Sequence, residues 1–187
     1  MTLCIPQVRD DGRLAGRVLR YHTWPTHQRQ SVAEHSWQVM RIIGVIWPEA
    51  PVHIFQYIIR HDSPEILTGD APYPVKANNP TLAAEMNRLE DEGLEELVKG
   101  GFMFNSLPLT PDERWAFKLA EFIEMWEFGL EEEMLGNKFA RLVTQRCWKA
   151  IWDRIRNDVF QTLDKDKKAI AKRAKEYVTR RDLTWEP

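Results

Sequence analysis

Cysteine is scarce in this chain, and its scarcity excludes two ways of stabilising a fold. The two cysteines among 187 residues, Cys4 and Cys147, form neither a Cys-x-x-Cys pair nor a zinc-binding pattern. A chain of this length buries well over half of its unfolded surface, so it needs no disulfide to hold a core together. Two widely spaced cysteines therefore indicate free thiols in a reducing compartment.

Long hydrophobic runs and a strong excess of one charge are also missing. The most apolar stretch, residues 42–47, is far too short to cross a bilayer. Residues 1–10 lack the cationic start and apolar centre of a signal peptide. The formal net charge is only −2, which argues against the broad basic surface that polymeric nucleic acid requires. We therefore expect a cytoplasmic protein with neither a membrane nor a nucleic-acid partner.

Strand signals are absent, and helical periodicity takes their place. No segment alternates convincingly between apolar and polar residues, and no Asn-Gly turn suggests a hairpin. We predict one all-α domain over residues 1–187, a bundle of about six helices, with a motif-bearing core at about 17–137 and C-terminal helices at 138–180. The predicted helices span residues 31–47, 52–61, 80–100, 110–130, 138–160 and 164–179. The Gly- and Pro-rich residues 69–74 are predicted to form a loop.

Capping residues mark three of these helix starts. Ser31 with Glu34, and Thr110 with Glu113, form capping-box patterns. Asn79 can cap the helix that begins at the following proline. The last helix is strongly basic, which predicts a solvated face.

Imidazole and carboxylate groups gather at positions that point into the predicted bundle. His35 lies on the apolar face of its helix, and His61 ends the apolar face of the next one. The complete group is His35, His61, Asp62, Glu65 and Asp70. Carboxylates that converge in a helical core repel one another and need a counter-charge. A divalent transition metal ion (Co, Mn, Ni, Fe or Zn) would supply it, since imidazole and carboxylate ligands suit these metals.

A further ligand is expected from the fourth predicted helix. Glu121 shares a face with Phe117, Met125 and Phe128, and a carboxylate among large apolar residues needs a partner. The alternative is an exposed glutamate in an acid-rich helix. Glu121 is therefore predicted to complete the set of metal ligands.

The order of three motifs resembles a known family. The segments 31–36 (SVAEHS), 61–70 (HDSPEILTGD) and 74–76 (PVK) are similar to those of bacterial HD-domain 5′-deoxynucleotidases. They are equally similar to phage relatives that hydrolyse deoxynucleoside triphosphates, including a dATP triphosphohydrolase. The resemblance covers about residues 17–137 and implies an HD-domain helical bundle with a metal site in its core.

The resemblance implies a role for each matching residue. Metal ligation is implied for His35, His61, Asp62 and Glu121. Glu65 would position or deprotonate the attacking water, and Asp70 would bind the sugar end or help to order that water. Phosphate contacts are implied for Arg20 and Lys76, and sugar and base contacts for Tyr21, Thr23 and Pro74.

The implied activity is hydrolysis at the 5′ α-phosphate of a deoxynucleotide. A nucleotidase would release phosphate from a monophosphate, a triphosphohydrolase would release tripolyphosphate, and the motifs do not separate the two. No histidine follows His61, whereas HD proteins with two metals use further histidines downstream. We therefore expect one protein-held ion, with any second ion held by substrate phosphates. Relatives tend to dimerise, so a homodimer or larger homo-oligomer is expected.

Two positions depart from the family pattern. Glu121 stands where the family usually has Asp, and Tyr21 where the nucleotidases usually have Trp. The longer Glu121 side chain makes a catalytically silent nucleotide-binding module an alternative. A third possibility is an interaction protein that uses the basic C-terminal helix.

Overall fold

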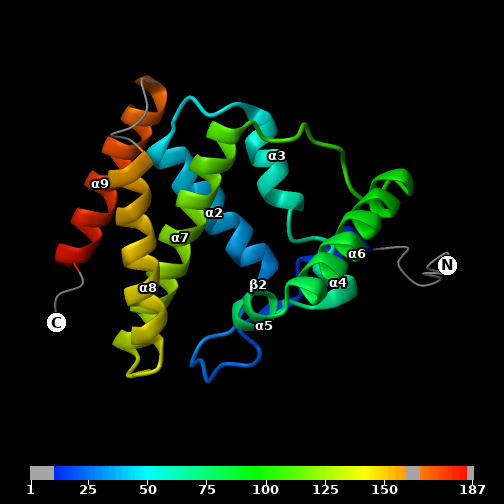
Figure 1. Cartoon of the computed structure of the whole chain (residues 1–187), viewed down its shortest axis with the longest axis horizontal. Helices are drawn as coiled ribbons and strands as arrows, with labels where there is room; N and C mark the ends of the chain where they lie inside the picture. The colour runs from blue at the N-terminus through cyan, green and yellow to red at the C-terminus, as the bar shows by residue number, and fades with distance from the viewer. Residues whose placement is uncertain (1–10, 159–164, 185–187) are drawn as a thin grey trace.

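The computed structural model describes residues 11–158 and 165–184 and is mostly helical (Figure 1). Six of the described helices have nine or more residues: α2 (Val32–Ile46), α3 (Val52–Arg60), α6 (Pro80–Lys99), α7 (Pro111–Met134), α8 (Ala140–Asp153) and α9 (Lys165–Thr184). The shorter ones are α1 (Asp11–Ala15), α4 (Glu65–Thr68) and α5 (Tyr73–Asn78). The all-α prediction is confirmed, and the six expected helices correspond to the six long ones.

Both predicted capping boxes are present. The Glu34 backbone N–H donates to Ser31 Oγ (3.2 Å), and the Ser31 N–H donates to the Glu34 carboxylate (2.7 Å). Thr110 and Glu113 make the same reciprocal pair at the start of α7. The expected cap by Asn79 is wrong, because its amide Nδ2 donates backwards to Val75 O at the end of α5.

Several predicted boundaries need correction. The predicted loop at 69–74 ends early, because α5 begins at Tyr73. Helix α7 continues four residues past the expected end at 130. The fifth predicted helix divides into α8 and a π-helical turn at Arg154–Asp158, and its last two residues, 159 and 160, lie outside the described part of the chain.

A two-stranded antiparallel sheet contradicts the expectation that strands are absent. Strand β1 (Leu19–Arg20) pairs with β2 (Gln30–Ser31), with Arg20 opposite Gln30. Strands of two residues are too short to show alternation in a sequence. The chain turns sharply after β1, where Tyr21 adopts the left-handed backbone region with φ at 56°. The sheet places Arg20 beside Gln30, directly before the N-terminal end of α2.

Helix α7 lies at the centre of the bundle, between α2 and α8, and α9 packs against α2 and α7 (Figure 1). The side chains that fill this core have almost no exposed surface, among them Val39, Ile42, Ile46, Leu119, Ile123, Trp126 and Ile151. The expected solvated face of the last helix accounts for one side of α9 only. Its other side buries Ile170, Ala171, Ala174 and Val178 in the core.

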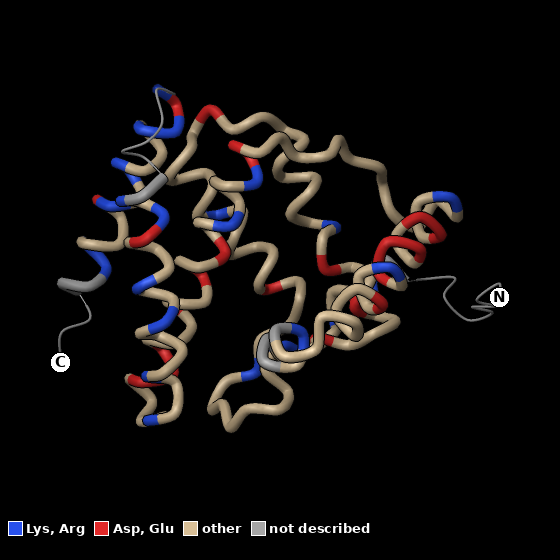
Figure 2. Tube along the Cα trace, in the orientation of Figure 1, with Lys and Arg blue, Asp and Glu red and all other residues tan. Residues whose placement is uncertain are grey.

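Helices α4, α5 and α6 form an arm at the opposite side of the molecule from α9 (Figure 1). Helix α6 packs on α4 and α5, and Gly93 and Leu97 are its buried residues. Figure 2 shows acidic positions along α6 and basic positions along α9, at opposite ends of the view. Among the described helices, none combines the length and the apolar character that a membrane span requires.

Candidate active site

The bundle and the start of the arm bring two histidines and one aspartate together. His35 points inward from α2 with no exposed surface, and His61 caps the C-terminal end of α3 with a side chain 7% exposed. Asp62 follows directly. One ligand atom from each of the three residues lies within 4.8 Å of the others. Asp62 Oδ1 is 3.0 Å from His61 Nε2, and Asp62 Oδ2 is 3.7 Å from His35 Nε2.

Both histidines turn Nε2 toward Asp62, while Nδ1 points away from it to another partner. His35 Nδ1 lies 2.7 Å from Glu124 Oε2, and His61 Nδ1 lies 2.6 Å from Ile58 O. A carbonyl or carboxylate oxygen can only accept, so Nδ1 carries the proton on both rings. Both Nε2 atoms are buried. His35 Nε2 has no hydrogen-bond partner among the described residues, and His61 Nε2 faces the Asp62 carboxylate. Two imidazole lone pairs facing one carboxylate fit a divalent transition metal ion.

Glu121 reaches the cluster from α7 but is shared with a cation. Its Oε1 atom lies 3.6 Å from His61 Nε2, and its Oε2 atom lies 2.5 Å from Lys118 Nζ. Burial would raise the pKa of Glu121, but the close contact with His61 and the charge of Lys118 outweigh burial and lower the pKa. Glu121 is not part of the compact three-residue group. Its side chain is thus within reach of the site, with one oxygen already engaged.

Glu65 begins α4 beside this group and is 9% exposed. Burial, followed by the charges of Asp62 and Asp70, raises its pKa to about 8, against the opposing effect of Arg20 and Lys76. Glu65 Oε2 has no hydrogen-bond partner among the described residues. A carboxyl group whose pKa lies near neutrality can accept and release a proton under physiological conditions.

Arg20 and Asp70 hold the start of the loop between the strands. Arg20 Nη1 donates to Gln30 Oε1 (3.2 Å) and lies 3.4 Å from Glu124 Oε2. The Tyr21 backbone N–H donates to Asp70 Oδ2 at 3.0 Å. The Tyr21 ring stacks on Phe128 of α7, with centroids 4.9 Å apart. Asp70 therefore fixes the left-handed backbone at Tyr21.

The other three residues expected to contact substrate, Lys76, Thr23 and Pro74, lie outside the cluster of His35, His61 and Asp62. Lys76 Nζ is 3.1 Å from Glu90 Oε1 of α6, so the arm holds it by an ion pair. Thr23 is exposed in the loop after Tyr21. Pro74 lies in α5, and its side chain is outside the described part of the structure.

Glu124 and Gln30 belong to this site and were missed in the sequence. Glu124 is 2% exposed, and its Oε1 atom accepts from Gln30 Nε2 at 2.6 Å. Burial would raise its pKa, but His35, Arg20 and the bond from Gln30 lower it. Helical spacing could have found Glu124, since it lies three residues after Glu121 and seven after Phe117 on the inward face of α7.

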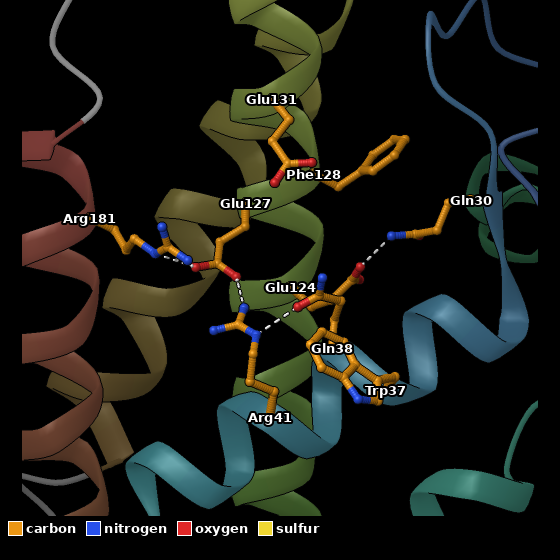
Figure 3. A pocket seen from close by; sticks show the side chains of 9 residues that line it. All are labelled: Gln30, Trp37, Gln38, Arg41, Glu124, Glu127, Phe128, Glu131 and Arg181. Carbon is orange, nitrogen blue, oxygen red and sulfur yellow. Dashed lines mark hydrogen bonds and ion pairs between the residues drawn. The ribbon is translucent and has the colours of Figure 1, made fainter.

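A cavity of about 210 Å³ lies between α2, α7 and α9, with Glu124 on its wall (Figure 3). Figure 3 shows Glu124 directed toward Gln30, while Glu127 lies between Arg41 and Arg181. Glu127 thus ties α9 to α2 in a network separate from the contact between Glu124 and His35.

Comparison with known proteins gives consistent similarities. Residues 16–101 match a family described as 5′-deoxynucleotidase YfbR-like. A 5′-deoxynucleotidase of Vibrio cholerae is 30% identical over 65% of this chain and 73% of its own length. One from Photorhabdus laumondii is 28% identical over 74% of this chain and 81% of its own length. A dATP triphosphohydrolase of Salmonella phage PMBT28 is 30% identical over 61% of each chain.

Proposed function

The chain belongs to the YfbR-like 5′-deoxynucleotidase family, and on this premise we propose that it hydrolyses the 5′ α-phosphate linkage of deoxynucleotides with one bound divalent metal ion. The observation that carries the proposal is the convergence of the buried Nε2 atoms of His35 and His61 with the Asp62 carboxylate, next to a carboxyl group whose pKa is raised to about 8. That combination supplies both a cation site and a proton acceptor.

In this proposal His35, His61 and Asp62 hold the ion, and Glu121 adds a further oxygen from α7. Co, Mn, Ni, Fe and Zn all suit this donor set. When bound, the ion would lower the pKa of a water molecule and offset negative charge on the phosphoryl oxygens. A second ion, if the reaction uses one, would be held by substrate phosphates.

The side chains around the cluster divide the remaining work. Glu65 takes the proton of the attacking water, for which its raised pKa suits it. Arg20 grips the phosphate by hydrogen bonds in a fixed plane, and Lys76 adds a positive charge from the arm. Asp70 keeps Tyr21 in place at the sugar and base end, to which Thr23 and Pro74 are also assigned.

The test is an assay of metal-loaded protein, with Co and Mn in parallel, on the four dNMPs and the four dNTPs. Nucleoside plus phosphate from a dNMP would identify a nucleotidase, and nucleoside plus tripolyphosphate from a dNTP would identify a triphosphohydrolase. Relatives of both names resemble the chain at similar identity. Absence of both products from protein shown to contain metal would overturn the proposal.

One observation favours a second candidate, a catalytically silent nucleotide-binding module. Glu121 stands where the family usually has Asp, and its Oε2 is engaged by Lys118. Under this alternative, Glu121→Asp would convert metal-loaded but inactive protein into an active enzyme. If the unmodified chain turns over deoxynucleotides, the alternative fails.

A further inference from the structure

A buried carboxylate stands behind one of the metal-binding histidines. Glu124 Oε2 lies 2.7 Å from His35 Nδ1, on the opposite side of the ring from the Nε2 atom that faces Asp62. The two side chains are 1% and 2% exposed, so little water competes for this contact. A hydrogen bond to a carboxylate in a dry environment is stronger than one between neutral groups.

The Glu124 carboxylate is itself held on both oxygens. Gln30 Nε2 donates to Oε1 at 2.6 Å, and Arg20 Nη1 lies 3.4 Å from Oε2. Gln30 and Arg20 are directly opposite each other in the small sheet, so one structural element presents both donors to Glu124. The carboxylate therefore has a fixed position from which it can orient His35.

A neutral imidazole can carry its proton on either nitrogen, and only one of the two forms leaves Nε2 free to bind a metal. Because Glu124 can only accept, it selects the form with the proton on Nδ1. His61 receives the same selection from a backbone carbonyl, Ile58 O, which no side-chain substitution removes. Of the two histidines, His35 is thus the one whose Nδ1 atom is held by another side chain.

We infer that Glu124 is a positioning residue of the metal centre, which fixes the tautomer and ring orientation of His35 and thereby raises metal affinity. The inference rests on the metal site of the proposed function and adds a residue that this function does not require. Partners of this kind typically contribute about 10–100-fold to metal affinity.

The test compares Glu124→Ala and Glu124→Gln with Glu127→Gln in the full chain. Glu127 is a matched control because it is also buried, lies one turn away on α7, and pairs with Arg41 and Arg181 instead of a histidine. Affinity for Co²⁺ is measured by competition with a chelator, without nucleotide. Nitrogen-15 NMR of the metal-free protein at alkaline pH reports which nitrogen of His35 carries the proton.

We expect wild-type His35 to be protonated on Nδ1, and Glu124→Ala to bind Co²⁺ about 10–100-fold more weakly with a mixture of tautomers. The Co²⁺ affinity of Glu124→Gln should lie between those of wild type and Glu124→Ala, because an amide oxygen can still accept but carries no charge. If Glu124→Ala does not fold, Glu124→Gln alone provides the test. Glu127→Gln should bind Co²⁺ as wild type does. Wild-type affinity in the Glu124 variants, or an equal loss in Glu127→Gln, would overturn the inference while leaving the proposed function intact. A wild-type chain that binds no metal would instead overturn both.

Discussion

The two sides of the candidate active site come from regions that are built differently. The bundle supplies His35 and Glu121 from helices whose neighbouring core side chains have almost no exposed surface. The arm supplies Glu65 and Lys76, and its longest helix, α6, buries few side chains and contacts α4 and α5 rather than the bundle core.

In the proposed function, this difference separates the metal ligands of the bundle from the proton acceptor of the arm. Groups on a densely packed scaffold keep their geometry when a neighbour changes, whereas an element with few buried contacts opens and shifts at low free-energy cost. Changes in the bundle should therefore affect metal affinity and the free energy of unfolding. Changes in the arm should affect turnover while the fold and the metal site persist.

The largest expected effects come from removing one side chain of the metal cluster, His61, and one of the arm, Glu65. His61→Ala removes a ligand and should lower metal affinity by more than about 100-fold, since even partners behind a ligand contribute 10–100-fold. Glu65→Ala should keep its metal and lose about 10²–10⁴-fold in turnover, the usual contribution of a proton acceptor. Metal content by elemental analysis and kcat on the preferred deoxynucleotide check the pair. Loss of metal from Glu65→Ala would contradict the separation.

Glu132 should have the next largest effect, on stability. It is 1% exposed and accepts from the backbone N–H groups of His27 and Gln28 and from Asn137 Nδ2, which fastens the loop after β1 to α7. Hydrogen bonds to a buried charge contribute about 1.5–3 kcal/mol each, so Glu132→Gln should unfold at a distinctly lower temperature.

The effect of Glu132 should depend on pH in a defined direction. Burial would raise its pKa, but the bonds from Asn137, His27 and Gln28 outweigh burial and lower it below the ordinary value of 4.5. The carboxylate therefore stabilises the fold fully above that ordinary value, and the stabilisation disappears as pH falls through the lowered pKa. The difference in Tm between wild type and Glu132→Gln should be greatest at neutral pH and should shrink in acid. A difference that grows in acid would contradict the assignment.

Replacing one glycine by alanine in each region tests directly how tightly the bundle and the arm are packed. A Cβ at Gly129 would lie 2.5 Å from Thr144 Oγ1 where α7 meets α8, and a Cβ at Gly93 would lie 2.3 Å from the end of the flexible Leu67 side chain. Overpacking costs about 1–3 kcal/mol, and the helix preference of Ala returns about 1 kcal/mol. Gly129→Ala should therefore lower Tm, whereas Gly93→Ala should leave Tm nearly unchanged and reduce kcat several-fold by shifting Leu67 near Glu65. The reverse result in Tm would show that the arm is the more tightly packed region.

The features that could be predicted from the sequence are those set by residues close together in the chain. Capping boxes act within four residues, and helical periodicity identifies an inward face, so α2 and α7 could be predicted together with the inward positions of His35 and Glu121. His61 and Asp62 are neighbours in the chain, so the sequence alone places them close together.

The features that the sequence did not reveal depend on distant partners. The pairing of β1 with β2 extends over two residues on each strand, too few for a periodic signal. The left-handed backbone of Tyr21 depends on Asp70, which is 49 residues away, and the role of Glu124 depends on His35, which is 89 residues away. Residue type alone does not predict such contacts, and the metal-binding role of Glu121 itself stays a prediction.

The smallest expected effect concerns the ion pair that holds Lys76. Glu90 Oε1 accepts from Lys76 Nζ (3.1 Å) and from Thr68 Oγ1 (3.3 Å), and both charged side chains are partly exposed. In the proposed function, the substrate phosphate therefore competes with Glu90 for the ammonium group of Lys76. Exposed pairs of this kind contribute up to about 1 kcal/mol, so Glu90→Gln should lower KM by no more than about fivefold.

Glu92 is the matched control for this last change. It lies on the same helix and pairs with Arg88 on an exposed face away from Lys76, so Glu92→Gln should leave KM unchanged. Steady-state kinetics on both variants at fixed metal concentration provides the measurement. A rise in KM for Glu90→Gln would mean that Glu90 aligns Lys76 for phosphate instead of competing with it, and the arm would then be a more ordered part of the site than its few buried residues indicate.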